Sequence, residues 1–122
     1  MREQRLYERF KIELAAKYKL LHSSADAELF DATIVDIGAA GFYFLTKDLP
    51  DLGQTIELNI SIDSEKLILT VVVIWLGKGE NSEYEVGVKI VDASMEDQTK
   101  LVRFYLDHLL GLCEKRKELS MT

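Results

Sequence analysis

Two arginines near the start of the chain have a spacing that suits binding of one anion. Arg5 and Arg9 lie four positions apart in the stretch QRLYERFKI. Both side chains therefore share a face whether the segment is helical or extended. Glu8 and Glu13 follow them at three and four positions, so ordinary surface ion pairs explain the same pattern. Taken alone, the two arginines favour that structural explanation.

A second stretch, TIVDIGAAGFYF, combines a carboxylate with two glycines. Asp36 is followed by Gly38 and Gly41, which bracket two alanines. Glycine can adopt positive φ and lets a ligand approach the backbone closely. A hairpin turn that needs glycine explains the pattern equally simply. In isolation, the D-x-G-x-x-G pattern favours the turn.

Composition predicts one soluble domain. The chain has 122 residues, 48% of them hydrophobic, with one proline and a net charge of -6, which suits a single packed core. Overall acidity argues against broad, sequence-independent binding to DNA or RNA. The first residues are charged, and the apolar stretch LILTVVVIWL is about half the length of a membrane-spanning helix. We therefore expect a cytoplasmic protein with no targeting segment and no membrane insertion.

Alternating apolar and polar residues predict six strands. The alternation is strict over residues 11–20, and five later segments have strand patterns bounded by turn residues, namely 30–37, 41–46, 55–62, 67–76 and 84–90. Its parity breaks between Asp36 and Ile37, which indicates a bulge or strand end that turns Asp36 toward the rim. Residues 67–76 are apolar on both faces, so we expect another element to cover them. The predicted fold class is all-β, an antiparallel barrel or sandwich.

A helix is predicted after the last strand. Ser94 can cap a helix that starts at Met95, and apolar residues follow at helical spacing. The helix must bury one side against the strands, and its second apolar side could serve a partner or a homodimer. The expected organisation is an N-terminal arm (1–10), a barrel (11–93) and a C-terminal helix of the same domain (94–122).

The sequence carries no pattern typical of catalysis. Neither His22 nor His108 accompanies a nucleophile motif, and the carboxylates lack metal-ligand spacing. Cys113 has no partner for an internal disulfide or a metal site, so we expect a reduced thiol. No phosphate-binding glycine loop of the G-x-x-x-x-G-K-[ST] type is present. We predict no catalytic residues, no metal site and no enzyme activity.

Taken together and in this order, the two stretches resemble the PilZ domain family of bacterial cyclic di-GMP receptors. The resemblance rests on R-x-x-x-R before the first strand and D-x-G-x-x-G between the second and third. It extends to VVVIWLGKGENSEYEVGVKIVDAS, which looks like the closing strand pair of that family, and covers roughly residues 2–108. It implies a six-stranded antiparallel β-barrel with a C-terminal helix, and cyclic di-GMP as a ligand rather than a cofactor.

The resemblance also implies which residues bind the ligand. The arginine pair falls on Arg5 and Arg9, the acidic residue on Asp36 and the final glycine on Gly41. Gly38 stands where the family usually has serine, and loss of one hydrogen bond there would weaken binding by about threefold to tenfold. Weaker candidates are Arg2, Gln4 and Ala39.

The function implied is that of a receptor that changes conformation on binding and regulates a protein partner. Motility, biofilm formation and exopolysaccharide production are the expected outputs, with an N-terminal arm closing over the ligand. The alternative is a PilZ-fold adaptor that binds no nucleotide and acts through protein contacts. A single-strand nucleic-acid binder would need exposed aromatics on a basic face, whereas Phe42 and Phe44 share the parity of core residues.

Overall fold

The computed structural model describes the backbone of residues 10–21, 28–38 and 41–120, and the side chains of 11–21, 28–38 and 41–108. Six strands and one helix make up this part of the chain, in agreement with the sequence pattern. Their bounds are β1 Phe10–Leu20, β2 Phe30–Ile37, β3 Gly41–Thr46, β4 Thr55–Ile62, β5 Glu65–Lys78, β6 Tyr84–Ala93 and α1 Met95–Ser120.

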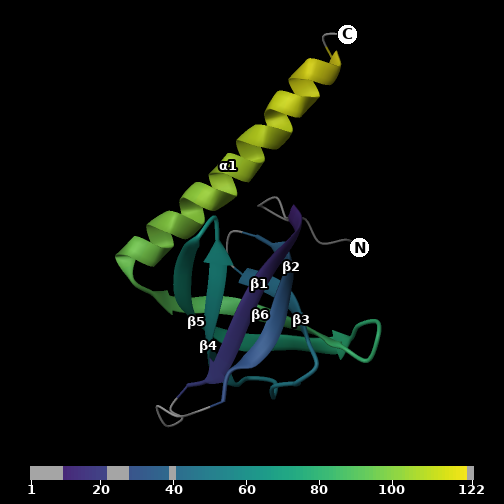
Figure 1. The fold of residues 1–122 in the computed structure, drawn as a ribbon, viewed down its shortest axis with the longest axis vertical. Coiled ribbons are helices and arrows are strands. Elements are labelled where there is room, and N and C mark those ends of the chain that lie inside the picture. The colour runs from purple at the N-terminus through teal and green to yellow at the C-terminus, as the bar shows by residue number, and fades with distance from the viewer. Residues whose placement is uncertain (1–9, 22–27, 39–40, 121–122) are drawn as a thin grey trace, which may run out of the picture.

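The strands close into a barrel in which every neighbouring pair is antiparallel. Their order is β1-β2-β3-β6-β5-β4, and β1 pairs with both β2 and β4 to complete the closure (Figure 1). The hairpin between β4 and β5 turns at Asp63 and Ser64, which have φ angles of 49° and 70°, as tight two-residue turns require. The predicted six-stranded antiparallel barrel is confirmed.

Inward-facing side chains fill the barrel. The innermost residues, each no more than 1% exposed, include Ile34, Phe44, Ile56, Leu58, Leu69 and Val71. Tyr18 joins them, and its hydroxyl donates a hydrogen bond to the carbonyl oxygen of Asp48. Burial, helped by the nearby charge of Asp48, raises the pKa of Tyr18 to about 12. The lumen is therefore a packed core, so any ligand must bind on the outside.

Two bulges decide which side chains face outward. The pairing of β2 with β3 shifts between Ile34 and Asp36, which confirms the bulge expected from the sequence. Ile34 and Ile37 are both fully buried as a result, while Asp36 faces outward. The pairing of β5 with β6 shifts between Val73 and Trp75. Val73 is 1% exposed but Trp75 is 43% exposed, although alternation alone would put both on one face.

Helix α1 starts at a capped N-terminus and packs against β5. The hydroxyl oxygen of Ser94 accepts a hydrogen bond from the Asp97 amide at 3.0 Å, which confirms the predicted cap. Leu101 and Phe104 are buried against the barrel. The ammonium group of Lys100 lies 3.5 Å from a carboxylate oxygen of Glu65 on β5. These contacts come from the first turns, and the rest of the helix extends past the barrel (Figure 1).

The expectation that another element covers the outside of residues 67–76 is wrong for most of that strand. Ile68, Ile74 and Trp75 are each more than 40% exposed, because α1 contacts only part of β5. Within the described chain, no helix has the length and apolar character that crossing a bilayer needs.

Candidate functional site

Asp36 lies on the outside of the barrel, near the end of β2. Its side chain is only 13% exposed, and one carboxylate oxygen is 3.7 Å from the ammonium nitrogen of Lys11 on β1. Lys11 itself is 92% exposed. The carboxylate is thus largely buried, beside a cation that is exposed to solvent.

Gly38 and Gly41 stabilise the connection between β2 and β3 and its packing against β6. The amide of Gly38 donates a hydrogen bond to the carbonyl oxygen of Gly41 at 3.0 Å, which closes the turn. A Cβ atom on Gly41 would lie 2.1 Å from the carbonyl oxygen of Val88 on β6. The two glycines therefore belong to a turn, as one of the two explanations of the motif expected. A ligand contact at either of them stays a prediction.

The other predicted ligand residues, Arg2, Gln4, Arg5, Arg9 and Ala39, lie outside the described residues. The start of β1 nevertheless constrains where the arginine stretch is attached. Phe10 is the Cα partner of Ile37, and Lys11 is the partner of Asp36. Because Arg9 is bonded to Phe10, the chain that carries the arginine pair joins the barrel beside the predicted carboxylate.

Five residues form one continuous row across five strands. Lys11 on β1 is partnered with Asp36 on β2, Asp36 with Tyr43 on β3, Tyr43 with Gly87 on β6, and Gly87 with Trp75 on β5. We call this set the outer row. With neighbouring strands about 4.8 Å apart, it spans roughly 19 Å around the outside of the barrel.

Two aromatic rings form the far end of the outer row. The rings of Tyr43 and Trp75 meet edge to face, with their centroids 5.6 Å apart. Gly87 makes this contact possible, because a Cβ atom there would lie 2.6 Å from Cε1 of Tyr43. The indole also covers Gly77, where a Cβ atom would be 2.4 Å from Cη2 of Trp75. The sequence analysis missed this aromatic pair, since only the strand register brings the two rings together.

The outer row combines groups suited to a planar, hydrogen-bonding ligand. A fixed carboxylate accepts hydrogen bonds from N–H groups, and exposed aromatic rings stack on bases. Lys11 adds a positive charge next to the carboxylate. Such a row can stack on the face of a heterocyclic ligand and at the same time accept hydrogen bonds from its N–H edge.

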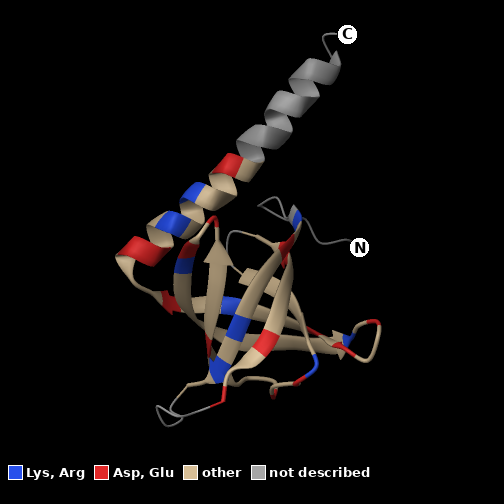
Figure 2. Cartoon of the chain, viewed as in Figure 1, with Lys and Arg blue, Asp and Glu red and all other residues tan. Residues whose placement is uncertain are grey.

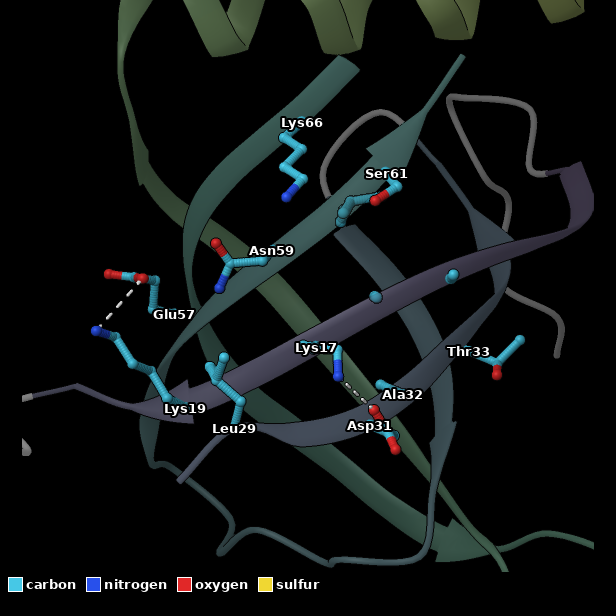
Figure 3. Close-up of a pocket in the computed structure, with 13 residues that line it drawn as sticks. Lys17, Lys19, Leu29, Asp31, Ala32, Thr33, Glu57, Asn59, Ser61 and Lys66 are labelled. Carbon is cyan, nitrogen blue, oxygen red and sulfur yellow. Dashed lines mark ion pairs between the residues drawn. The ribbon is translucent and has the colours of Figure 1, made fainter. Parts of the chain in front are cut away.

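A separate hollow lies on a different part of the barrel. It has a volume of about 590 Å³ and lies over β1, β2 and β4, with small side chains such as Ala15 and Thr33 in its lining (Figure 3). Two of its lysines are already paired, Lys17 with Asp31 at 3.1 Å and Lys19 with Glu57 at 3.8 Å. It contains none of the predicted ligand residues.

The charges of the described residues do not form a basic surface. Lysines and arginines are interspersed with aspartates and glutamates around the barrel (Figure 2). The described part of the chain also contains no group of three His, Cys, Asp or Glu side chains placed to hold a metal ion.

The fold defines the class of protein, a closed six-stranded antiparallel barrel extended by a C-terminal helix. The family model described as "PilZ domain" matches residues 3–107. The chain therefore belongs to the PilZ domain family, whose ligand is cyclic di-GMP.

Several solved PilZ proteins share this fold at low sequence identity. The inhibitor of motility MotI (DgrA) of Bacillus subtilis aligns with a TM-score of 0.71 and 16% identity, over 89% of this chain and 53% of that one. The PilZ domain of YcgR from Escherichia coli, solved with c-di-GMP, aligns with a TM-score of 0.69 and 14% identity. The alignment covers 94% of this chain and 98% of that one. MrkH in the K. pneumonia MrkH–c-di-GMP complex aligns with a TM-score of 0.70 and 17% identity. The alignment covers 93% of this chain and 55% of that one.

The chain spans about half the length of MotI and of MrkH. The YcgR PilZ domain, in contrast, is covered almost completely. No curated protein matches the sequence significantly.

Proposed function

We propose that this chain is a cyclic di-GMP receptor that binds the nucleotide on the outer row, next to the arginine stretch. The observation that carries the proposal is the register. It places Asp36 beside the attachment point of Arg9, and it continues through Tyr43 to the exposed Trp75. Membership of the PilZ family and the likeness to proteins solved with c-di-GMP support the same assignment.

Each group in the site meets a different part of the ligand. Asp36 accepts hydrogen bonds from N1–H and the N2 amino group of a guanine. One arginine of the pair Arg5 and Arg9 donates two parallel hydrogen bonds to O6 and N7 of a guanine. The other arginine binds a phosphate group. The faces of Trp75 and Tyr43 offer stacking for the bases, which is worth about 1–3 kcal/mol per base.

Binding would change what the chain presents to a partner. The arginines precede β1, whereas Asp36 and the aromatic pair belong to a closed barrel, so we propose that closure of the N-terminal arm over the ligand completes the site. MotI is described as an inhibitor of motility and MrkH as a transcription regulatory factor. We propose regulation of a protein partner in the cytoplasm, with motility, biofilm formation or exopolysaccharide production as the output.

Trp75 allows a direct test, because it is the single tryptophan of the chain. Titration of the full chain with cyclic di-GMP should change the intrinsic fluorescence in a saturable manner as a guanine stacks near the indole. Cyclic di-AMP is the matched control, since adenine lacks the N1–H and N2 amino donors that Asp36 would accept. Equal responses to the two nucleotides, or no response to either, would contradict the proposal.

The second candidate function is that of an adaptor that binds no nucleotide. Gly38 favours it, because glycine offers no hydroxyl and its amide is already bonded to Gly41. An adaptor would leave the fluorescence of Trp75 unchanged at all nucleotide concentrations. The same titration therefore separates the two functions.

A further inference from the structure

Helix α1 carries an exposed apolar stripe on the side that faces away from the barrel. Met95, Val102 and Leu106 are 76%, 55% and 46% exposed. Leu101 and Phe104, which anchor the helix, lie on the opposite face and are less than 10% exposed. At 100° per residue the two sets differ by about half a turn. The stripe therefore receives no cover from the barrel it belongs to.

The residues of this stripe have the spacing of a helix–helix interface. Together with exposed neighbours they form two rows in which successive members are four positions apart, one of Met95, Thr99, Arg103 and Asp107 and one of Gln98, Val102 and Leu106. Arg103 and Asp107 stand at the edge of the stripe, because they also line the groove between α1 and the barrel. Rows of this kind fit between those of a second helix. The hydroxyl of Thr99 donates to the carbonyl oxygen of Met95 at 2.9 Å, so its polar group is already satisfied.

We propose that the stripe binds a second copy of this chain, with the two α1 helices antiparallel. A two-fold axis perpendicular to the helices brings the first row against the same row of the other copy. Arg103 of each copy then lies opposite Asp107 of the other. Both side chains are exposed in one chain, and within the described residues neither forms an ion pair with a residue of the barrel, so each can reach the opposite charge of the other copy. A parallel pair would instead set these charges against the row of Gln98, Val102 and Leu106.

The length of the helix supports the same occupant. With 26 residues α1 is about 39 Å long. The residues that pack it against the barrel lie in its first turns. In proteins most of the stability of a helix comes from packing of its amphipathic face rather than from helix propensity. An antiparallel partner centred near Leu106 supports the part that passes the barrel and keeps the two barrels on opposite sides of the helix pair. The inference is independent of nucleotide binding.

The oligomeric state of the full chain tests the proposal in the absence of nucleotide. Sedimentation equilibrium should give twice the chain mass of 13.9 kDa. The double variant Val102→Asp/Leu106→Asp should give the single-chain mass with unchanged Trp75 fluorescence, because both positions are exposed in one chain. Leu52→Asp is the matched control, since Leu52 is 64% exposed outside α1, and should remain dimeric. A single-chain mass for the wild type, or a dimer that survives the double variant, would overturn the proposal.

Charge exchange tests the antiparallel arrangement. Arg103→Asp removes both reciprocal pairs at once, so the dissociation constant should rise by roughly twofold to thirtyfold. Adding Asp107→Arg in the same chain recreates both pairs in reverse and should restore the dimer. Failure of the double exchange to restore it would overturn the antiparallel arrangement.

Discussion

Asp36 is the residue on which the proposed ligand site depends most. Its side chain is only 13% exposed and lies 3.7 Å from the ammonium nitrogen of Lys11, so the surrounding residues restrict its freedom before any ligand arrives. A preorganised acceptor of this kind loses little entropy when it meets the donor edge of a guanine.

Replacing Asp36 by alanine should weaken cyclic di-GMP binding by about tenfold to a hundredfold, because hydrogen bonds to a charged group are worth about 1.5–3 kcal/mol. Fluorescence titration of Trp75 measures the change. Asp31→Ala is the matched control, since Asp31 is on the same strand but pairs with Lys17 in the separate hollow. A loss of equal size in both variants would contradict a specific role for Asp36.

The residues of the site differ in how far the sequence could predict them. Asp36, Gly38 and Gly41 were proposed from the resemblance to the PilZ family, because their motif is local in the chain, and their ligand contacts stay a prediction. Tyr43 and Trp75 were missed, although their ring centroids are 5.6 Å apart. They are 32 positions apart in sequence and both face Gly87 on a third strand, and single-sequence patterns do not encode that pairing.

At the scale of elements, apolar patterns bounded by turn residues predicted every strand, and capping chemistry predicted the start of α1. The bulge near Asp36 was also foreseen, since a break in parity between Ile34 and Ile37 has few other causes. The bulge between Val73 and Trp75 was not predicted, because a continuous apolar run has no alternation of polar and apolar residues that a bulge could interrupt. That bulge turns Trp75 outward and creates the aromatic end of the outer row.

The contact between β3 and β6 gives a prediction about Gly41. Gly41→Ala should lower the free energy of unfolding by about 1–3 kcal/mol, because the new Cβ atom would meet the backbone oxygen of Val88. Urea denaturation measures the loss. Amide exchange should accelerate in β3 and β6 and stay unchanged where β1 pairs with β4. An unfolding free energy equal to that of the wild type would show that the strands adjust without cost.

At the scale of the whole molecule, the barrel is a rigid support with two attachments. Among the described strands, its closure leaves no open sheet edge, and its lumen is filled. The arginine stretch joins one side of it and α1 another, so the proposed nucleotide site and the proposed dimer surface use different parts of the chain. Loss of one function should leave the other intact.

The most direct test of the central claim is calorimetric titration of the full chain with cyclic di-GMP. The account predicts saturable binding with a dissociation constant in the micromolar range or tighter. It also predicts that the variant Arg5→Ala/Arg9→Ala loses most of this affinity. No heat of binding with the wild type, or unchanged affinity in the variant without both arginines, would contradict it.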